Sequence, residues 1–183
     1  MIMGKILEGK SGYYSCWYNK LQFTLFLVAF LTFGIGDTIT SLNMIEQKGT
    51  VGEGNLILRY IILNYGISNY IIIKIFVTFA ILVLPFLIIN ETVFWMLNGY
   101  FVSFIIAGIL GMVLNIMAMN NQIPFLSPYQ AITLFMVSVL ILTNIGDEID
   151  KRVHPKIKPF FYCLLEDIAL IIIKIANTSK NKE

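Results

Sequence analysis

Long apolar runs separated by short polar connectors dominate this chain. Four runs are long enough to cross a bilayer as helices, which takes about 20 residues each: 21–45, 69–89, 93–119 and 129–145. A glycine-rich connector, residues 49–55, and a brief apolar stretch, 56–65, separate the first two runs. At about 1.5 Å per helical residue, that stretch spans only half a bilayer. It therefore predicts a re-entrant or interfacial half-helix.

The chain ends in a charged segment, 146–155, which predicts a loop, and a last apolar segment, 157–176. Glu166, Asp167 and Lys174 interrupt this last segment on one helical flank. That pattern favours an amphipathic interfacial helix, with a fifth span as the alternative. The predicted fold is thus an all-α integral membrane protein, a bundle of four transmembrane helices within a single membrane domain, 1–183.

Composition supports a membrane protein. Hydrophobic residues make up 57% and charged residues 13% of the 183 residues, and the mean hydropathy is +0.79. One soluble core of this size would not bury that much apolar surface, so we expect the lipid bilayer as partner. A net charge of +2 with scattered basic residues argues against nucleic-acid binding. Cys16 and Cys163 indicate neither a disulfide framework nor a metal site.

The distribution of basic residues predicts the orientation. Lysines precede the first apolar run within the N-terminal segment 1–20, and basic residues also follow the fourth run. No small-x-small cleavage pattern lies near the end of the first run, so we expect it to be a retained helix and not a secretory signal. Because such residues concentrate in cytoplasmic segments, we expect a multi-pass protein of the cell membrane with both termini in the cytoplasm. The connectors 49–65 and 120–130 then lie outside. The residues that carry this prediction are Lys5, Lys10, Lys20, Lys151, Arg152, Lys156 and Lys158.

Tyrosines mark the outer side in this orientation. Tyr60, Tyr65 and Tyr70 lie in or just after the first outer connector. Because tyrosine is enriched at membrane–water interfaces, they predict an aromatic belt at the outer membrane surface.

A carboxylate within the first run needs an explanation. An ionisable group inside a transmembrane segment costs about 3 kcal/mol or more, which marks Asp37 as a candidate functional residue. Asp37, Thr40 and Ser41 share one helical stripe, and Lys74 enters the next long helix from the same side at a similar depth. Together with two residues of the connector they form the candidate ligand-binding set: Asp37, Thr40, Ser41, Glu53, Asn55 and Lys74.

Two interpretations of this set compete. Asp37 and Lys74 form a buried ion pair that fixes the register of two helices, or the carboxylates line a cavity that binds a cation, a proton or a polar head group. A third alternative is that Lys74 extends to the interface.

The same residues resemble the signature of a family of small prokaryotic multi-pass membrane proteins of unknown function. Its members have Asp-x-x-Thr near the end of the first helix, then Glu-x-Asn-Pro, then a glycine and a lysine. The matching residues are Asp37, Thr40, Gly52, Glu53, Asn55, Gly66 and Lys74. Leu56 stands where the family has proline. The resemblance covers residues 21–84 and implies no activity.

The third run repeats small or polar residues at intervals of four: Gly99, Ser103, Ala107, Gly111 and Asn115. This spacing predicts close helix packing, with a contact at Ala107 and Gly111. Asn115 has a second interpretation as a donor to the central site.

No catalytic or metal-binding motif is recognisable in the sequence, so we assign no catalytic residue, metal ligand or cofactor. His154 with its acidic neighbours is interpreted as part of a solvated loop. The functional classes rank as binding or transport of a cation or small polar ligand first, a structural or assembly subunit second, and an intramembrane enzyme third. The assembly role implies a homo-oligomer or another membrane protein as partner.

Overall fold

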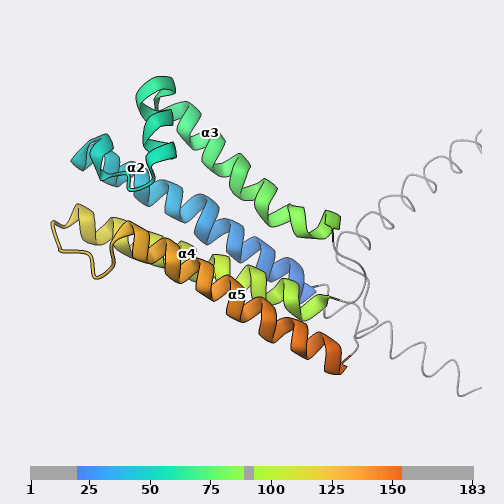
Figure 1. The fold of residues 1–183 in the computed structure, drawn as a ribbon. Coiled ribbons are helices and arrows are strands. Elements are labelled where there is room, and N and C mark those ends of the chain that lie inside the picture. Colours follow the sequence, from blue (N-terminus) through green and yellow to red (C-terminus); the bar gives the residue numbers. More distant parts are fainter. Residues whose placement is uncertain (1–19, 89–92, 154–183) are drawn as a thin grey trace, which may run out of the picture.

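The computed structural model describes residues 20–88 and 93–153, which form four long helices and the connections 49–55 and 120–127 (Figure 1). All four helices are long and apolar enough to cross a membrane: Lys20–Lys48, Leu56–Pro85 within α3 (Leu56–Ile88), α4 (Phe94–Met119) and α5 (Pro128–Val153). The prediction of an all-α bundle of four transmembrane helices is confirmed. Residues 1–20, apart from Lys20, and the predicted helix 157–176 lie outside the described part.

The first helix is composite. Residues 20–29 are α-helical, η1 (Phe30–Gly36) is a π-helix, and α2 (Asp37–Lys48) continues to the connector. The backbone N–H of Asp37 donates to the carbonyl of Thr32, five residues back, which is the π pattern. Such segments are rare and often mark functional sites.

The connector turns sharply after α2. Gly49 has φ 75° and ψ 178°, a combination that is accessible essentially only to glycine. A short 3-10 turn, η2 (Thr50–Gly52), follows, and Glu53 is extended. The Asn55 side chain accepts hydrogen bonds from the backbone N–H groups of Ile57 (3.0 Å) and Leu58 (3.4 Å), and so caps the start of α3. With this cap the helix starts at Leu56, the position at which members of the family that the sequence resembles have proline.

The helix α3 is broken at Gly66, whose φ of 82° and ψ of 170° are not helical. The residues before the break form the short half-helix that the sequence predicts, and the residues after it form the long second span. In Figure 1 the two parts meet at a sharp bend at the end of the bundle where the connector lies. The half-helix and the connector together fold back against the bundle.

The helices α4 and α5 form the closest pair. A Cβ at Gly99 would come within 2.3 Å of the Leu142 carbonyl oxygen, and a Cβ at Gly146 within 2.3 Å of the Trp95 carbonyl oxygen. The first helix approaches α4 at Gly108, where a Cβ would lie 2.5 Å from the Phe33 backbone nitrogen. Glycines therefore allow the close approaches of α4. Gly99 belongs to the predicted stripe, whereas the closest approach to the first helix is at Gly108, outside it, and the predicted contact at Ala107 stays a prediction.

Two apolar cores hold the bundle together. One, near the end where the described chain begins, contains Phe26, Ala29, Leu82, Leu97, Phe101 and Phe104. The other, near the connector, contains Met44, Ile45, Ile62 and Tyr70. By contrast, α3 packs mainly against the first helix and makes few contacts with α4 and α5. Leu82 in the first core and the hydrogen bond from Tyr100 OH to the Ile81 carbonyl join α3 to α4, and a cavity lies between these contacts and the connector.

The prediction of a charged loop over 146–155 was wrong for residues 146–153. The helix α5 continues to Val153, and its charged residues pair one turn apart, Lys151 with Asp147 (2.6 Å) and Arg152 with Glu148 (2.9 Å). Asp150 is buried, with 4% of its surface exposed, and accepts hydrogen bonds from the backbone N–H groups of Trp95 and Met96, both at 2.9 Å. The charges thus stabilise the end of α5 and the start of α4.

Candidate functional site

Asp37 lies at the junction of η1 and α2, where the helix changes from π to α geometry. Its side chain faces α4 at Gly111, where a Cβ would lie 2.6 Å from Asp37 Oδ1. The absence of a side chain at position 111 therefore makes room for the carboxylate. Thr38 and Ser41 on the same helix are buried, with 2% and 3% exposed.

Asp37 forms an ion pair with Lys74 of α3, with 2.9 Å between Oδ2 and Nζ. Only 17% of the Asp37 side chain and 11% of the Lys74 side chain are exposed. The other carboxylate oxygen, Oδ1, accepts a hydrogen bond from Asn115 Nδ2 at 3.0 Å. The predicted pairing of Asp37 with Lys74 is therefore present, and it joins the first helix to α3 and α4.

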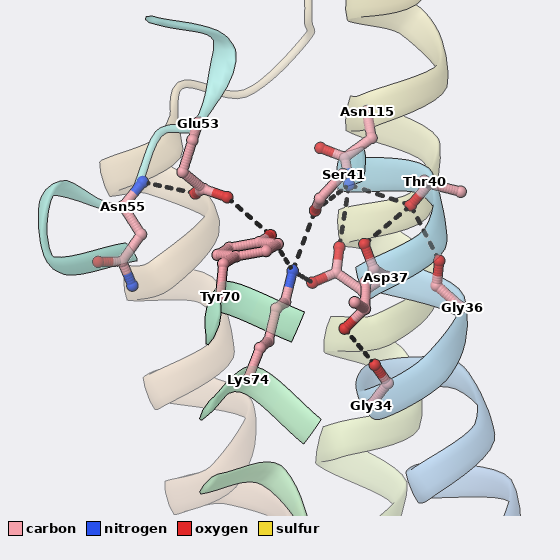
Figure 2. Close-up of polar contacts among 11 residues, drawn as sticks. Gly34, Gly36, Asp37, Thr40, Ser41, Glu53, Asn55, Tyr70, Lys74 and Asn115 are labelled. Atoms are coloured by element: carbon pink, nitrogen blue, oxygen red, sulfur yellow. Dashed lines mark hydrogen bonds and ion pairs between the residues drawn. The ribbon is translucent and has the colours of Figure 1, made fainter. Parts of the chain in front are cut away.

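The ammonium of Lys74 has three acceptors. Besides Asp37, it donates to Ser41 Oγ (3.0 Å) and to Tyr70 OH (3.1 Å). Tyr70 in turn donates to Glu53 Oε2 at 3.1 Å, and this tyrosine is completely buried. One chain of contacts thus runs from Asp37 through Lys74 and Tyr70 to Glu53 (Figure 2).

The connector holds Glu53 in place. Only 7% of its surface is exposed, and its Oε1 accepts a hydrogen bond from the backbone N–H of Asn55 at 2.8 Å. Arg59 donates to the backbone carbonyls of Glu53 and Val51, and these bonds hold the loop in place. The guanidinium is thus bonded to the main chain of Glu53 and not to its carboxylate. Among residues 20–88 and 93–153, the ion pairs do not include the Glu53 carboxylate.

A cavity of about 560 Å³ lies beside this network. Its polar wall includes Asp37, Ser41, Glu53, Asn55, Lys74 and Asn115. Its other walls are apolar and come from α3, α4, the segment before α5 and the start of α5, including Ile57, Ile61, Val77, Ile81, Leu126 and Ile132. The volume is in the range of small-molecule sites, which combine apolar walls with a few polar groups.

All six residues of the predicted set lie in this region. Asp37, Ser41, Glu53, Asn55 and Lys74 line the cavity. Thr40 lies beside it, where it accepts a hydrogen bond from Asn115 Nδ2 (3.1 Å) and donates to the carbonyl of Gly36 (3.0 Å), four residues back.

Tyr70 is a residue of this hydrogen-bond network that the predicted set lacks. The sequence places it in an aromatic belt at the membrane surface, yet it is buried between Lys74 and Glu53. Its spacing from Lys74, four residues on one helix, was the available signal. Asn115 joins the site as the second interpretation of its position predicts.

Within the described ranges, no group of three histidine, cysteine, aspartate or glutamate residues is placed to hold a metal ion. His154 lies outside these ranges. Comparison of the chain with protein-family models, curated proteins and solved structures gave no match. The geometry of the site therefore carries the functional argument.

Proposed function

We propose that this protein binds, or binds and transports, a small polar or cationic ligand at the intramembrane site formed by Asp37, Ser41, Glu53, Asn55 and Lys74. The observation that carries the proposal is the cavity, which reaches both the buried Glu53 carboxylate and the partly buried Asp37 carboxylate. Ionisable groups inside a membrane protein commonly mark such ligand sites. The resemblance to the family of small multi-pass membrane proteins is compatible with this role and adds no activity to it.

The orientation belongs to the same proposal. In the structure, the described start of the first helix and the end of α5 lie at one end of the bundle, and the connector with Glu53 lies at the other (Figure 1). Lys20, Lys151 and Arg152 thus gather at one end. With this end in the cytoplasm of a cell membrane, the cavity lies in the outer half of the bilayer.

An assembly role is the second candidate, and one observation favours it. The ammonium of Lys74 and both oxygens of Asp37 have hydrogen-bond partners within the chain, so the pair is satisfied without a ligand. The role of such a pair can be purely structural: it can hold three helices in register without binding any ligand. The cavity and the second carboxylate, Glu53, favour binding over this role.

The geometry disfavours catalysis. Ser41 Oγ and Lys74 Nζ are 3.0 Å apart, which is the spacing of a nucleophile and its base. However, Lys74 Nζ donates to Ser41 Oγ, so its lone pair is not directed at the serine hydroxyl and it does not accept the hydroxyl proton. The Ser41–Lys74 contact therefore positions the ammonium and does not activate the hydroxyl.

The proposal is tested by the stability of the full-length protein in a neutral detergent with methylammonium chloride, with sodium chloride at equal ionic strength as the control. A ligand at 100 times its Kd stabilises the folded state by about 2.7 kcal/mol. We expect methylammonium to raise the thermal midpoint of the wild type and of Glu46→Gln, an exposed carboxylate on α2 outside the cavity. Asp37→Asn and Glu53→Gln should lose this response.

Cavity access gives an independent readout. Ala118 lines the cavity on α4. In a background with both native cysteines replaced by serine, a cysteine at position 118 should react with a small cationic thiol reagent, and methylammonium should slow that reaction. An unreactive cysteine together with no methylammonium-dependent stabilisation would leave the assembly role as the better account.

A further inference from the structure

We infer that the ligand is an amphiphile: a hydrocarbon chain that carries a primary ammonium head group and reaches the site from within the membrane. This inference rests on the proposed function and narrows its ligand class. The head group would lie against Glu53 and Asp37, and the chain would lie between α3 and the α4–α5 pair.

The charge of the cavity selects the head group. Two carboxylates, Asp37 and Glu53, and one ammonium, Lys74, line its wall. Lys74 contacts Asp37 directly and reaches Glu53 only through the Tyr70 hydroxyl. The Arg59 guanidinium donates to the main-chain carbonyl of Glu53, and no ion pair among the described residues includes the Glu53 carboxylate. The Glu53 carboxylate therefore has no cation in direct contact with it. Such a site attracts a cation and repels an anion.

Hydrogen-bonding capacity points the same way. The three protons of the Lys74 ammonium already have three acceptors. Each Glu53 oxygen accepts one hydrogen bond, from Asn55 N–H or Tyr70 OH, whereas a carboxylate oxygen can accept about two. The charged groups thus have acceptor positions to spare and no free ammonium proton. A primary ammonium supplies up to three donors to such a wall, and a quaternary ammonium supplies none.

The apolar walls select the rest of the ligand. Ile57, Val77 and Ile132 line the cavity, yet they are 72%, 45% and 52% exposed. These exposed side chains lie on helices that are long and apolar enough to cross a membrane, so we infer that the apolar side of the cavity opens toward the hydrocarbon of the bilayer. A small inorganic cation would leave this part of the cavity unfilled, whereas an alkyl chain would fill it and enter sideways.

The test measures binding of radiolabelled dodecylammonium to the full-length protein in phosphatidylcholine nanodiscs, with empty nanodiscs as the partition control. We expect saturable binding to the wild type and to Glu46→Gln. Binding to Glu53→Gln should be about tenfold weaker or more, because a hydrogen bond to a charged group contributes about 1.5–3 kcal/mol. Ile132→Trp places a larger side chain in the apolar part of the cavity. It should weaken dodecylammonium binding without changing the response to methylammonium.

Competition on the wild type keeps the test decisive if Glu53→Gln does not fold. Dodecylammonium should compete better than dodecanol, dodecyltrimethylammonium and dodecyl phosphate. Equal competition by dodecanol, or stronger competition by dodecyl phosphate, would overturn the head-group assignment. Displacement by phosphatidylethanolamine in the nanodisc would identify a bilayer lipid as the source of the ammonium, and its failure to displace would identify a free amine.

The failure of this inference differs from the failure of the proposed function. If methylammonium binds as tightly as dodecylammonium, the chain contributes nothing and the amphiphile is excluded, while a polar ligand site remains. If no ammonium compound binds the wild type above empty nanodiscs, both the amphiphile and the cation-binding function are wrong.

Discussion

The Asp37–Lys74 pair allows the sharpest prediction, because its two single substitutions should not be equally costly. Removing one partner of a buried pair destabilises a protein by about 3–5 kcal/mol when the other charge is stranded. Lys74→Met removes the ammonium that two carboxylates share. It leaves Asp37 with Asn115 alone, and it leaves Glu53 with only the Arg59 guanidinium, which is bonded to the Glu53 main-chain carbonyl. We therefore expect a loss of about 3–5 kcal/mol from the free energy of unfolding.

Asp37→Asn should cost less. Lys74 then keeps Ser41 and Tyr70 as acceptors, keeps Glu53 beyond the tyrosine hydroxyl, and gains the amide oxygen of the introduced side chain. We expect the free energy of unfolding to fall by about 1–3 kcal/mol, because the Lys74 ammonium exchanges a charged acceptor for a neutral one. The double variant should be more stable than the sum of the two losses indicates, with a coupling energy of about 1–3 kcal/mol, because it leaves neither charge of the pair stranded.

The assay is reversible unfolding in mixed micelles with increasing sodium dodecyl sulfate, read by circular dichroism. A matched control is the exposed ion pair of Glu148 and Arg152 on α5, whose nitrogen–oxygen distance is 2.9 Å, as in the Asp37–Lys74 pair. Glu148 and Arg152 lie four residues apart on one helix. Its coupling, measured with Glu148→Gln and Arg152→Met, should be about 0.5 kcal/mol or less. If the Asp37–Lys74 coupling is no larger than this control, or if Asp37→Asn costs more than Lys74→Met, then the shared-ammonium arrangement is wrong.

The packing, the helix cap and the orientation each allow a further prediction. Gly111→Leu should lower stability by about 1–3 kcal/mol, because even a Cβ there would lie 2.6 Å from Asp37 Oδ1; an unchanged thermal midpoint in detergent would contradict the predicted contact. Asp150→Ala should lower the free energy of unfolding by about 1–2 kcal/mol, because it removes the hydrogen bonds to the N–H groups of Trp95 and Met96 at the start of α4. The matched change at the partly exposed Asp147, Asp147→Ala, should change thermal stability little. Cysteines placed at positions 10 and 156 should resist an impermeant thiol reagent in intact cells; strong labelling from outside would overturn the proposed orientation, and opposite labelling of positions 10 and 180 would establish a fifth span.

The sequence predicts the spans well because a bilayer imposes a length on each apolar run and forbids irregular backbone in lipid. It also predicts the half-helix, since residues 56–65 are too few to cross a membrane and end at Gly66, which takes a conformation that only glycine adopts readily. The end of α5 was missed because a cluster of charges is also typical of a solvated loop. The acidic residues at 147 and 148 and the basic residues at 151 and 152 are spaced as helical pairs, which was the signal for a continuing helix.

The π-helix could not be predicted from the sequence, because no local pattern specifies it. The π-helix lies where the packing is close: a Cβ at Gly34 would be 3.3 Å from the Thr78 side chain, and Gly108 of α4 allows the backbone of Phe33 to approach closely. The extra residue per turn in η1 rotates α2 relative to the residues before it. This rotation contributes to the direction in which Asp37 points, toward Gly111 and Lys74.

The connector determines the chemistry of the site more than the transmembrane helices do. The helices alone bring together Asp37, Ser41, Lys74 and Asn115, which form a satisfied and nearly neutral group. Glu53 reaches this group only because the connector turns at Gly49 and is held by Arg59 and Asn55. Its carboxylate adds the second negative charge and the spare acceptor positions. A loop that served only to join two helices would not bury an extra carboxylate against them, because that burial has an electrostatic cost. The buried Glu53 is therefore the feature that most favours ligand binding over a purely structural pair.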